Sequence, residues 1–191
     1  MIIEEAIRNR ASIKVFSQEE VAAELIKRCL DVAVWAPNHH LTEPWSFHVI
    51  MNDAREMVAR MVEKEMVERA TGLNVPVAQA KAFKERQKLL SAPSIVAVYS
   101  AAGPDEKTTR ENFAASSAAA QNILLMAQSV GLASIWRTSA IYELPGVRRT
   151  LQVHPDATFV GALFLGHSAQ RTVKRRRTPA SEKTVWLNLG V

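Results

Sequence analysis

Three short segments of the sequence carry the side chains best suited to hold a ligand. Residues 8–14 gather arginine and lysine around the hydroxyl of Ser12, and such charge-assisted donors suit a phosphate group. Residues 35–45 form a loop framed by two tryptophans and two prolines, with His39 and His40 inside it. Exposed aromatic and imidazole groups on a rigid loop suit stacking against a flat heteroaromatic ligand. Residues 137–139, Arg-Thr-Ser, follow a predicted strand, where their side chains can donate hydrogen bonds to a ligand.

Each segment also has a purely structural explanation, and the residues alone do not decide between the two. A solvated charged turn would give the same pattern as residues 8–14. A packed corner would explain the tryptophans and prolines of residues 35–45. A cap for the next helical turn would explain the polar side chains of residues 137–139.

Several other kinds of site are not indicated by the sequence. None of the seven glycines forms a G-x-G-x-x-G pattern or a P-loop, which leaves no signal for a Rossmann or a nucleotide-triphosphate site. The motifs G-x-S-x-G and H-E-x-x-H are also missing, and only two of the five histidines are adjacent. Neighbouring residues of an extended loop point apart, so we expect no metal site. The single cysteine, Cys29, rules out a disulfide framework and is expected to be buried on the apolar side of a helix.

The length and composition are those of one ordinary globular domain. A chain of 191 residues with 48% hydrophobic and 23% charged residues can bury a proper core, so we expect a single domain over residues 1–191. No apolar stretch approaches the ~20 residues of a membrane span, and the N-terminus lacks the pattern of a signal peptide. These features favour a cytoplasmic protein with no membrane partner.

The positive charge of the chain is concentrated in one place. The formal net charge is +5, and the five cations Arg171, Lys174 and Arg175–Arg177 account for all of it. Basic residues clustered in this way indicate a local site or a solvated tail, and we expect no nucleic-acid partner. The rival interpretation, a nucleic-acid-binding module built on this run, requires an affinity that falls steeply with salt.

Hydrophobic periodicity and turn residues predict an alternation of helices and strands. One helix is expected over 2–10, and a second begins at Ser17, which opens a capping-box pattern, and stops at Pro37. Further helices are expected over 53–70 and 110–130, with Gly131 placed to end the last one. Strands are expected over 47–51, 94–99, 132–136 and 158–165, with 184–189 as a candidate for a fifth. The stretches 71–90, polar and either helical or irregular, and 171–183 interrupt this order, and the pattern predicts an α+β fold with a mixed or antiparallel sheet covered by helices.

The helix expected over 110–130 is rich in small residues. Its middle, residues 114–120, consists of alanine and serine alone. Side chains this small add little bulk to a core but let another helix approach closely, so we interpret them as the contact for a tightly packed partner helix. The intrinsic helix propensity of alanine is the alternative explanation.

Several of these segments together resemble the nitroreductase family. Arg10-Ala-Ser12-Ile-Lys14 is similar to the family's opening Arg-Arg-Ser-x-Arg. Residues 36–45, Ala-Pro-Asn-His-His-Leu-Thr-Glu-Pro-Trp, are similar to its Ala-Pro-x-x-x-x-x-Gln-Pro-Trp, most of all in the subgroup with histidine in this loop. Residues 120–137 resemble the central helix and the following strand of the family, and residues 160–166 resemble its last core strand. The likeness covers nearly the whole chain in the right order.

The resemblance implies an intertwined homodimer, with residues 110–130 as the central dimer helix and one FMN in each of two sites at the interface. Residues 10–14 would hold the FMN phosphate or ribityl chain, and residues 137–139 would approach the flavin from the strand end. The loop would reach the flavin from the same chain or from the partner chain, and one of the cations at 175–177 would help to bind the phosphate. The cofactor-binding residues that follow are Arg10, Ala11, Ser12, Lys14, Trp35, His39, Arg137, Thr138, Ser139 and Arg177.

The resemblance also implies an NAD(P)H-dependent flavin oxidoreductase in which the flavin carries the chemistry and no side chain is a catalytic group. Hydride would pass from NAD(P)H to flavin N5, and a small acceptor such as a nitroaromatic or a quinone would then replace the nicotinamide in a ping-pong scheme. Groups near residues 137–139 would stabilise the anionic reduced flavin. A proton-donor role for His39 or His40 and the choice between NADH and NADPH stay open. A flavin-binding or flavin-remodelling protein of the same fold, without NAD(P)H turnover, is the alternative.

Three positions depart from the family's pattern. Ala11 and Lys14 stand where the family often has arginine. Lysine keeps the charge but lacks the planar fork that binds a phosphate with two parallel hydrogen bonds, so a weaker hold on the phosphate is expected. Glu43 replaces the usual glutamine before Pro-Trp, and for that reason no ligand contact is assigned to it.

Overall fold

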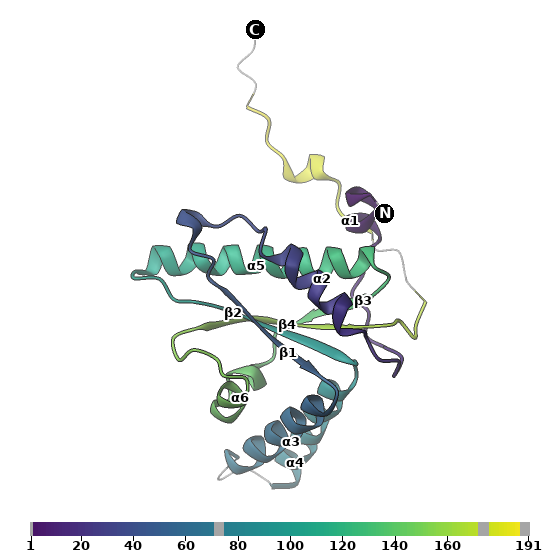
Figure 1. The fold of residues 1–191 in the computed structure, drawn as a ribbon, viewed down its shortest axis with the longest axis vertical. Coiled ribbons are helices and arrows are strands. Elements are labelled where there is room, and N and C mark those ends of the chain that lie inside the picture. Colours follow the sequence, from purple (N-terminus) through teal and green to yellow (C-terminus); the bar gives the residue numbers. More distant parts are fainter. Residues whose placement is uncertain (1, 71–74, 172–175, 188–191) are drawn as a thin grey trace.

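The computed structural model describes residues 2–70, 75–171 and 176–187, and a four-stranded sheet forms its centre (Figure 1). The strands are β1 (Trp45–Met51), β2 (Ser94–Ser100), β3 (Ala133–Arg137) and β4 (Thr158–Gly166). They lie in the order β1-β2-β4-β3, and each neighbouring pair is antiparallel. The α+β prediction and its four main strands are confirmed, and the sheet is antiparallel.

Helices cover both faces of this sheet. The helices α2 (Ala23–Ala33) and α5 (Glu106–Ser129) lie on one face, and α3 (Asp53–Glu68), α4 (Val75–Leu90) and α6 (Pro145–Thr150) lie on the other (Figure 1). Side chains of a strand alternate between the two faces. In β2, Tyr99 and its neighbours at 95 and 97 therefore belong to one hydrophobic cluster, and Val96 and Val98 belong to the other. That residues 1–191 form one domain stays a prediction.

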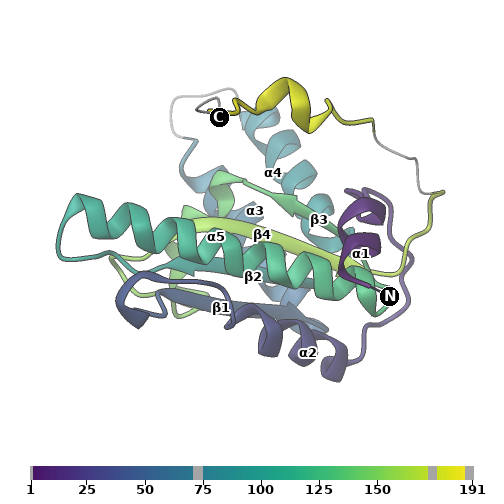
Figure 2. The ribbon, with the colours of Figure 1, turned by 90° about the horizontal axis from the view of Figure 1, so that it is seen from above.

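The helix α5 runs along the sheet with α2 beside it and α1 (Ile3–Asn9) near one end (Figure 2). The Asp105 carboxylate accepts a hydrogen bond from the amide N of Thr108 at 2.7 Å and caps the first turn. Gly131 follows the helix with a φ of 81°, the left-handed conformation that glycine adopts without strain. Ala119, Ala120 and Ala127 of α5 belong to a hydrophobic cluster that also includes Cys29 of α2. Cys29 is buried as predicted, and burial raises the pKa of its thiol to about 11.

The predicted helix start at Ser17 is wrong. The helix α2 begins only at Ala23, and Ser17 continues an extended N-terminal segment instead. The amide N of Ser17 donates to the carbonyl O of His167 at 2.8 Å, and Phe16 forms an antiparallel bridge with Ser168. Pairing with the chain beyond β4 therefore takes the place of the capping box, which a local sequence pattern could not anticipate.

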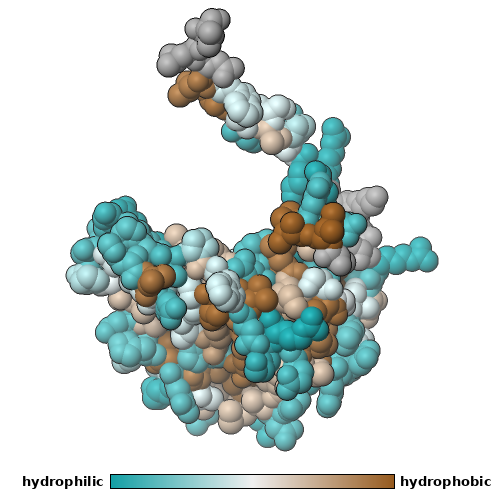
Figure 3. Space-filling model, turned by 45° about the horizontal axis from the view of Figure 1, so that its top comes forward, coloured by the Kyte–Doolittle hydropathy of each residue, from teal (hydrophilic) through white to brown (hydrophobic). Residues whose placement is uncertain are grey.

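The structure also defines residues 75–90 and 176–187, for which the sequence pattern left the conformation open. Residues 75–90, which the sequence left as helical or irregular, form the full helix α4. Residues 176–187 form an arm that stands clear of the body and contains one short 3-10 helix, η3 (Ala180–Lys183) (Figures 1 and 3). The candidate strand at 184–189 is wrong for residues 184–187, which pair with no strand among the described residues; residues 188 and 189 lie outside the described part.

Candidate functional site

Two of the predicted segments adjoin β3: residues 10–14 pair with it at Ser134, and residues 137–139 lie where it ends. The amide N of Ile13 donates to the carbonyl O of Ser134 at 3.0 Å, and Ser12 forms a parallel bridge with Ser134. The segment 10–14 therefore runs beside β3 and is joined to it at Ser134. The Gln170 side-chain oxygen accepts from the amide N of Lys14 at 3.1 Å and from that of Val15 at 3.0 Å, which fixes the other side of the segment.

The side chains of this segment differ in their surroundings. Ala11 is buried in the hydrophobic cluster, so it can offer a ligand only its backbone. Arg10 and Ser12 are half-buried, and Lys14 is exposed. The alternation of buried and accessible positions leaves the cations and the hydroxyl at the surface of the sheet edge, where an anion could reach them.

A hollow of about 300 Å³ lies where β3 ends. It is lined by Glu85, Lys88, Leu89, Arg137, Thr138, Ser139, Ile141, Tyr142 and Phe164. The Arg137 guanidinium lies over the Phe164 ring, 4.8 Å from its centroid, which holds the cation against the sheet. The Ser139 hydroxyl donates to Glu85 Oε2 at 3.3 Å, and Glu85 Oε1 also pairs with the Lys88 ammonium.

Two polar atoms beside this hollow are buried and lack a partner within the described chain. They are Nε of Arg137 and Oη of Tyr142. Tyr142 is only 1% exposed, and its own carbonyl O accepts from the Tyr99 hydroxyl at 2.7 Å, which fixes its backbone. Burial raises the pKa of Tyr142 well above its usual value, so the phenol keeps its proton and can donate it in a hydrogen bond. Most buried polar atoms in proteins have partners. Of the seven described side-chain atoms that lack one, these two belong to residues lining the hollow, where a ligand with acceptor atoms would satisfy them.

Sequence reasoning missed Glu85 and Lys88. Both lie in the last turns of α4, a stretch that offered no recognisable motif. Their spacing of three residues places them on one side of a helix, which was the available signal. The signal was weak because surface helices of ordinary proteins carry many such pairs.

The loop between Trp35 and Trp45 lies elsewhere in the chain. It leads into β1, and β1 and β3 are the two edges of the sheet. The Thr42 hydroxyl donates to Asn112 Oδ1 of α5 at 3.0 Å, and the amide N of Glu43 donates to Asn38 Oδ1 at 2.9 Å. Trp35 is 84% exposed, and His39 and His40 are exposed on the 3-10 helix η1 (His39–Leu41). Within the described chain, Trp35 and His39 are therefore not brought to the β3 edge.

Arg177 is also separate from the other predicted residues. It lies in the arm and is exposed, as is Arg176, and Arg175 lies outside the described residues. One chain thus assembles residues 10–14 and 137–139, and leaves the loop and the arm apart from them.

The comparisons with known proteins agree with this architecture. The model described as "Nitroreductase family" matches residues 7–167, which is most of the chain. This chain belongs to the nitroreductase family. The Bacillus subtilis (strain 168) protein named "Putative NAD(P)H nitroreductase YfhC" is 24% identical over 182 residues, covering 95% of this chain and 92% of its own.

Solved nitroreductase structures share the fold. A nitroreductase-like family protein from Bacillus cereus superposes with a TM-score of 0.84 at 24% identity, covering 98% of this chain and 96% of its own. A single-residue variant of the FMN and NADPH-dependent nitroreductase NfnB, from a Sphigopyxis strain, superposes with a TM-score of 0.78 at 20% identity, covering 99% and 100%. At these identities the likeness establishes the fold of this chain and nothing finer.

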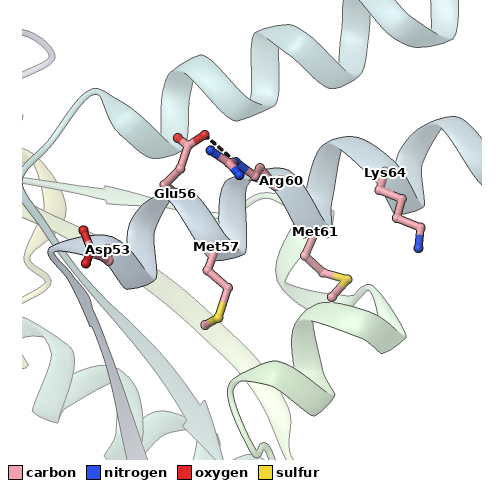
Figure 4. A pocket seen from close by; sticks show the side chains of 6 residues that line it. All are labelled: Asp53, Glu56, Met57, Arg60, Met61 and Lys64. Atoms are coloured by element: carbon pink, nitrogen blue, oxygen red, sulfur yellow. Dashed lines mark hydrogen bonds and ion pairs between the residues drawn. The ribbon is translucent and has the colours of Figure 1, made fainter.

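A second surface of the chain, along α3, is less suited to a ligand. A groove of about 540 Å³ along α3 is lined by Asp53, Glu56, Met57, Arg60, Met61 and Lys64 (Figure 4). Glu56 and Arg60 pair with each other at 2.8 Å, so their charges are already matched. Within the described residues, no lining side chain of this groove has a buried polar atom without a partner.

Over residues 2–70, 75–171 and 176–187, no three His, Cys, Asp or Glu side chains gather in a way that could hold a metal ion. None of the helices in the same ranges combines the length and the apolar character needed to cross a membrane.

Proposed function

We propose that this nitroreductase binds FMN and is an NAD(P)H-dependent oxidoreductase that reduces a small acceptor such as a nitroaromatic or a quinone. The hollow at the end of β3 carries the proposal, because its unpartnered Arg137 Nε and Tyr142 Oη suit the carbonyl and ring-nitrogen acceptors of a flavin. Bound FMN would supply the redox chemistry, taking hydride from NAD(P)H at N5 and passing two electrons to the acceptor. A further support is NfnB, which shares the fold and is described as FMN and NADPH-dependent.

Different residues at the β3 edge would hold different parts of the cofactor. Arg10, Ser12 and Lys14 would bind the phosphate and the ribityl chain, with Ala11 contributing only its backbone. Arg137 and Lys88, at the hollow, would stabilise negative charge on the ring system, because fixed cations in a partly buried site act more strongly than in water. Thr138 and Ser139, which follow β3, would position the ring. No side chain of the described chain needs to act as a nucleophile or general base in this scheme.

A second copy of the chain would complete the site. Large apolar side chains are exposed on several elements of the α1 and α5 side and on the arm. They include Ile2, Ile3, Ile7, Trp35, Leu41, Trp186 and Leu187. Exposed apolar groups in such number mark an interaction surface. In a homodimer, Trp35 and His39 of one chain would reach the flavin of the other, and the arm with Arg177 would cover the neighbouring chain.

The absorption spectrum of the purified protein tests the cofactor. Bands at about 370 and 450 nm, with FMN released on denaturation, are expected for a flavoprotein of this type. A colourless protein that cannot be reconstituted with FMN would contradict the proposal. Anaerobic addition of NADH and of NADPH then tests the activity: bleaching of the flavin is expected with at least one of them. A flavin that never bleaches would favour the alternative, a flavin-binding or flavin-remodelling protein without NAD(P)H turnover.

A further inference from the structure

We propose that Glu85 is a positioning residue that lowers the reduction potential of the bound flavin. The inference rests on the proposed function and adds to it a residue outside the motifs of the sequence. Glu85 lies at the hollow and touches two of its other walls. Its Oε1 pairs with Lys88 Nζ, and its Oε2 accepts from the Ser139 hydroxyl at 3.3 Å. The carboxylate therefore ties the end of α4 to the segment that follows β3.

The burial of Glu85 makes its charge effective. Its side chain is 18% exposed, compared with 40% for the side chain of Lys88. Water and salt screen a charge at such a position less than one at the surface. Among the described residues that line the hollow, Glu85 is the single anion, and Lys88 and Arg137 are the cations. Glu85 thus offsets one of two positive charges where the flavin ring would lie.

The balance of charge fixes the direction of the effect. A flavin ring that takes up two electrons and one proton from NAD(P)H gains one negative charge. Two unopposed cations would stabilise that charge strongly, whereas a carboxylate paired with one of them weakens the stabilisation. Glu85 therefore makes the reduced cofactor a stronger reductant. The residue would suit the enzyme to acceptors that are themselves difficult to reduce.

Glu85→Gln tests the proposal with little change of shape, because the amide oxygen of glutamine can still accept from Ser139. The measurement is the ratio of the dissociation constants of oxidised and reduced FMN, together with the midpoint potential of the bound FMN. We expect the substitution to favour reduced FMN about fivefold, which is a rise of about 20 mV at about 30 mV per tenfold for a two-electron couple. Lys88→Met should shift the ratio about as far in the opposite direction. The double variant should return close to the wild-type value, because the pair is then replaced by neutral groups.

Glu63→Gln provides the matched control. Glu63 lies on α3, pairs with Arg86 at 3.5 Å and lies outside the hollow, so its loss should leave the potential unchanged. An unchanged potential in Glu85→Gln, or a shift equal to that of Glu63→Gln, would overturn the inference while leaving FMN binding intact. Loss of oxidised-FMN binding by a folded Glu85→Gln variant would also overturn it, since a residue that tunes charge should not be needed for binding. Failure of the wild-type protein to bind FMN is a different result, and it counts against the proposed function.

Discussion

The β3 edge and the loop 35–45 obtain their contacts in different ways. At the β3 edge, one chain supplies the partners: Phe164 lies under Arg137, and Glu85 accepts from Ser139. In the loop, by contrast, Trp35 and Leu41 leave 84% and 81% of their surface exposed. The first region is shaped by the fold of the monomer. The loop 35–45 has a defined backbone shape, but its large apolar side chains are left exposed by its own chain. A second chain would supply the contacts that they lack.

The backbone of the loop shows that its shape is held in advance. His40, Leu41 and Glu43 have φ values of 53°, 53° and 44°, in the left-handed region that side chains other than glycine rarely adopt. Each such residue costs on the order of 1–2 kcal/mol, so the loop needs anchors. Asn112 of α5 is one, since it is 5% exposed and joins Thr42 to the carbonyl O of Ala101. A loop fixed before association loses less entropy when a partner binds.

Gly161→Ala should produce the largest effect, because a methyl group at this position of β4 would displace Trp136 of the neighbouring strand β3. A Cβ at position 161 would lie 1.9 Å from Nε1 of Trp136, whose indole N–H donates to the carbonyl O of Val160 at 3.3 Å. The indole would have to leave β3, and we expect the free energy of unfolding to fall by about 3 kcal/mol. Chemical denaturation measures it. Gly131→Ala is the control, where nothing lies within 4 Å and only the positive φ should cost about 1 kcal/mol. Equal losses in the two variants would contradict the close packing of Trp136.

Trp186→Ala tests the other side of the comparison. The tryptophan is 79% exposed on the arm, so its removal should hardly change the stability of one chain. If the arm packs on a second copy, self-association should weaken on the order of 30-fold, the effect of about 2 kcal/mol from one buried interface tryptophan. Analytical ultracentrifugation over a dilution series measures this. Lys183→Ala, on the same arm, is the control and should leave the dimer unchanged. If the Trp186→Ala dimer is as tight as the wild-type dimer, the arm does not pack in the interface.

The two regions also mark how far the sequence could predict the molecule. The sheet and the α5 helix were predicted well, since a buried run such as Ser94–Ser100 and a C-terminal glycine such as Gly131 act locally. Ser17 misled the prediction because the segment pairs with residues 167 and 168, far along the chain. Glu85 was missed for the same reason. Its role depends on Ser139, and 54 residues of chain separate the two.

The residues chosen for the site show a second limit. The sequence predicted segments 10–14 and 137–139, and the structure places both beside β3, while their role in binding stays a prediction. The loop with Trp35 and His39 was also singled out from its residue types, and Arg177 was chosen by resemblance, but one chain does not bring these three residues there. A site shared between two chains cannot be seen in the periodicity of one sequence, because that periodicity reports only which residues of the chain are buried.

Arg10→Ala separates the phosphate end of the proposed site from the ring end. Loss of one charge-assisted contact should weaken FMN binding about tenfold. Riboflavin, which lacks the phosphate, should bind the variant and the wild type equally. Fluorescence quenching on titration gives both constants. Arg8→Ala is the control, because Arg8 pairs with Glu4 at 2.7 Å on the exposed side of α1. Equal weakening of FMN binding and riboflavin binding would contradict a contact between Arg10 and the phosphate.

His48 gives the smallest expected effect, and it contrasts a histidine fixed by the monomer with the exposed pair at 39 and 40. Nδ1–H of His48 donates to the carbonyl O of Leu151 at 2.7 Å, and the Ser46 hydroxyl donates to Nε2 at 3.1 Å. The carbonyl can only accept, so this tautomer is set. Burial lowers the pKa of His48 below the usual 6.5, although the Leu151 bond opposes the shift.

The sign of the resulting pH dependence follows from that shift. The unfolded chain takes up a proton on this histidine near pH 6.5, whereas the folded chain resists it until a lower pH. The contribution of His48 to stability is therefore complete above pH 6.5 and is lost as the pH falls from there towards the folded pKa. Unfolding free energies measured from pH 8 to pH 5 should decline less in His48→Gln than in the wild type. Parallel curves would show that His48 is not the group that titrates, and an NMR titration of its ring checks this directly.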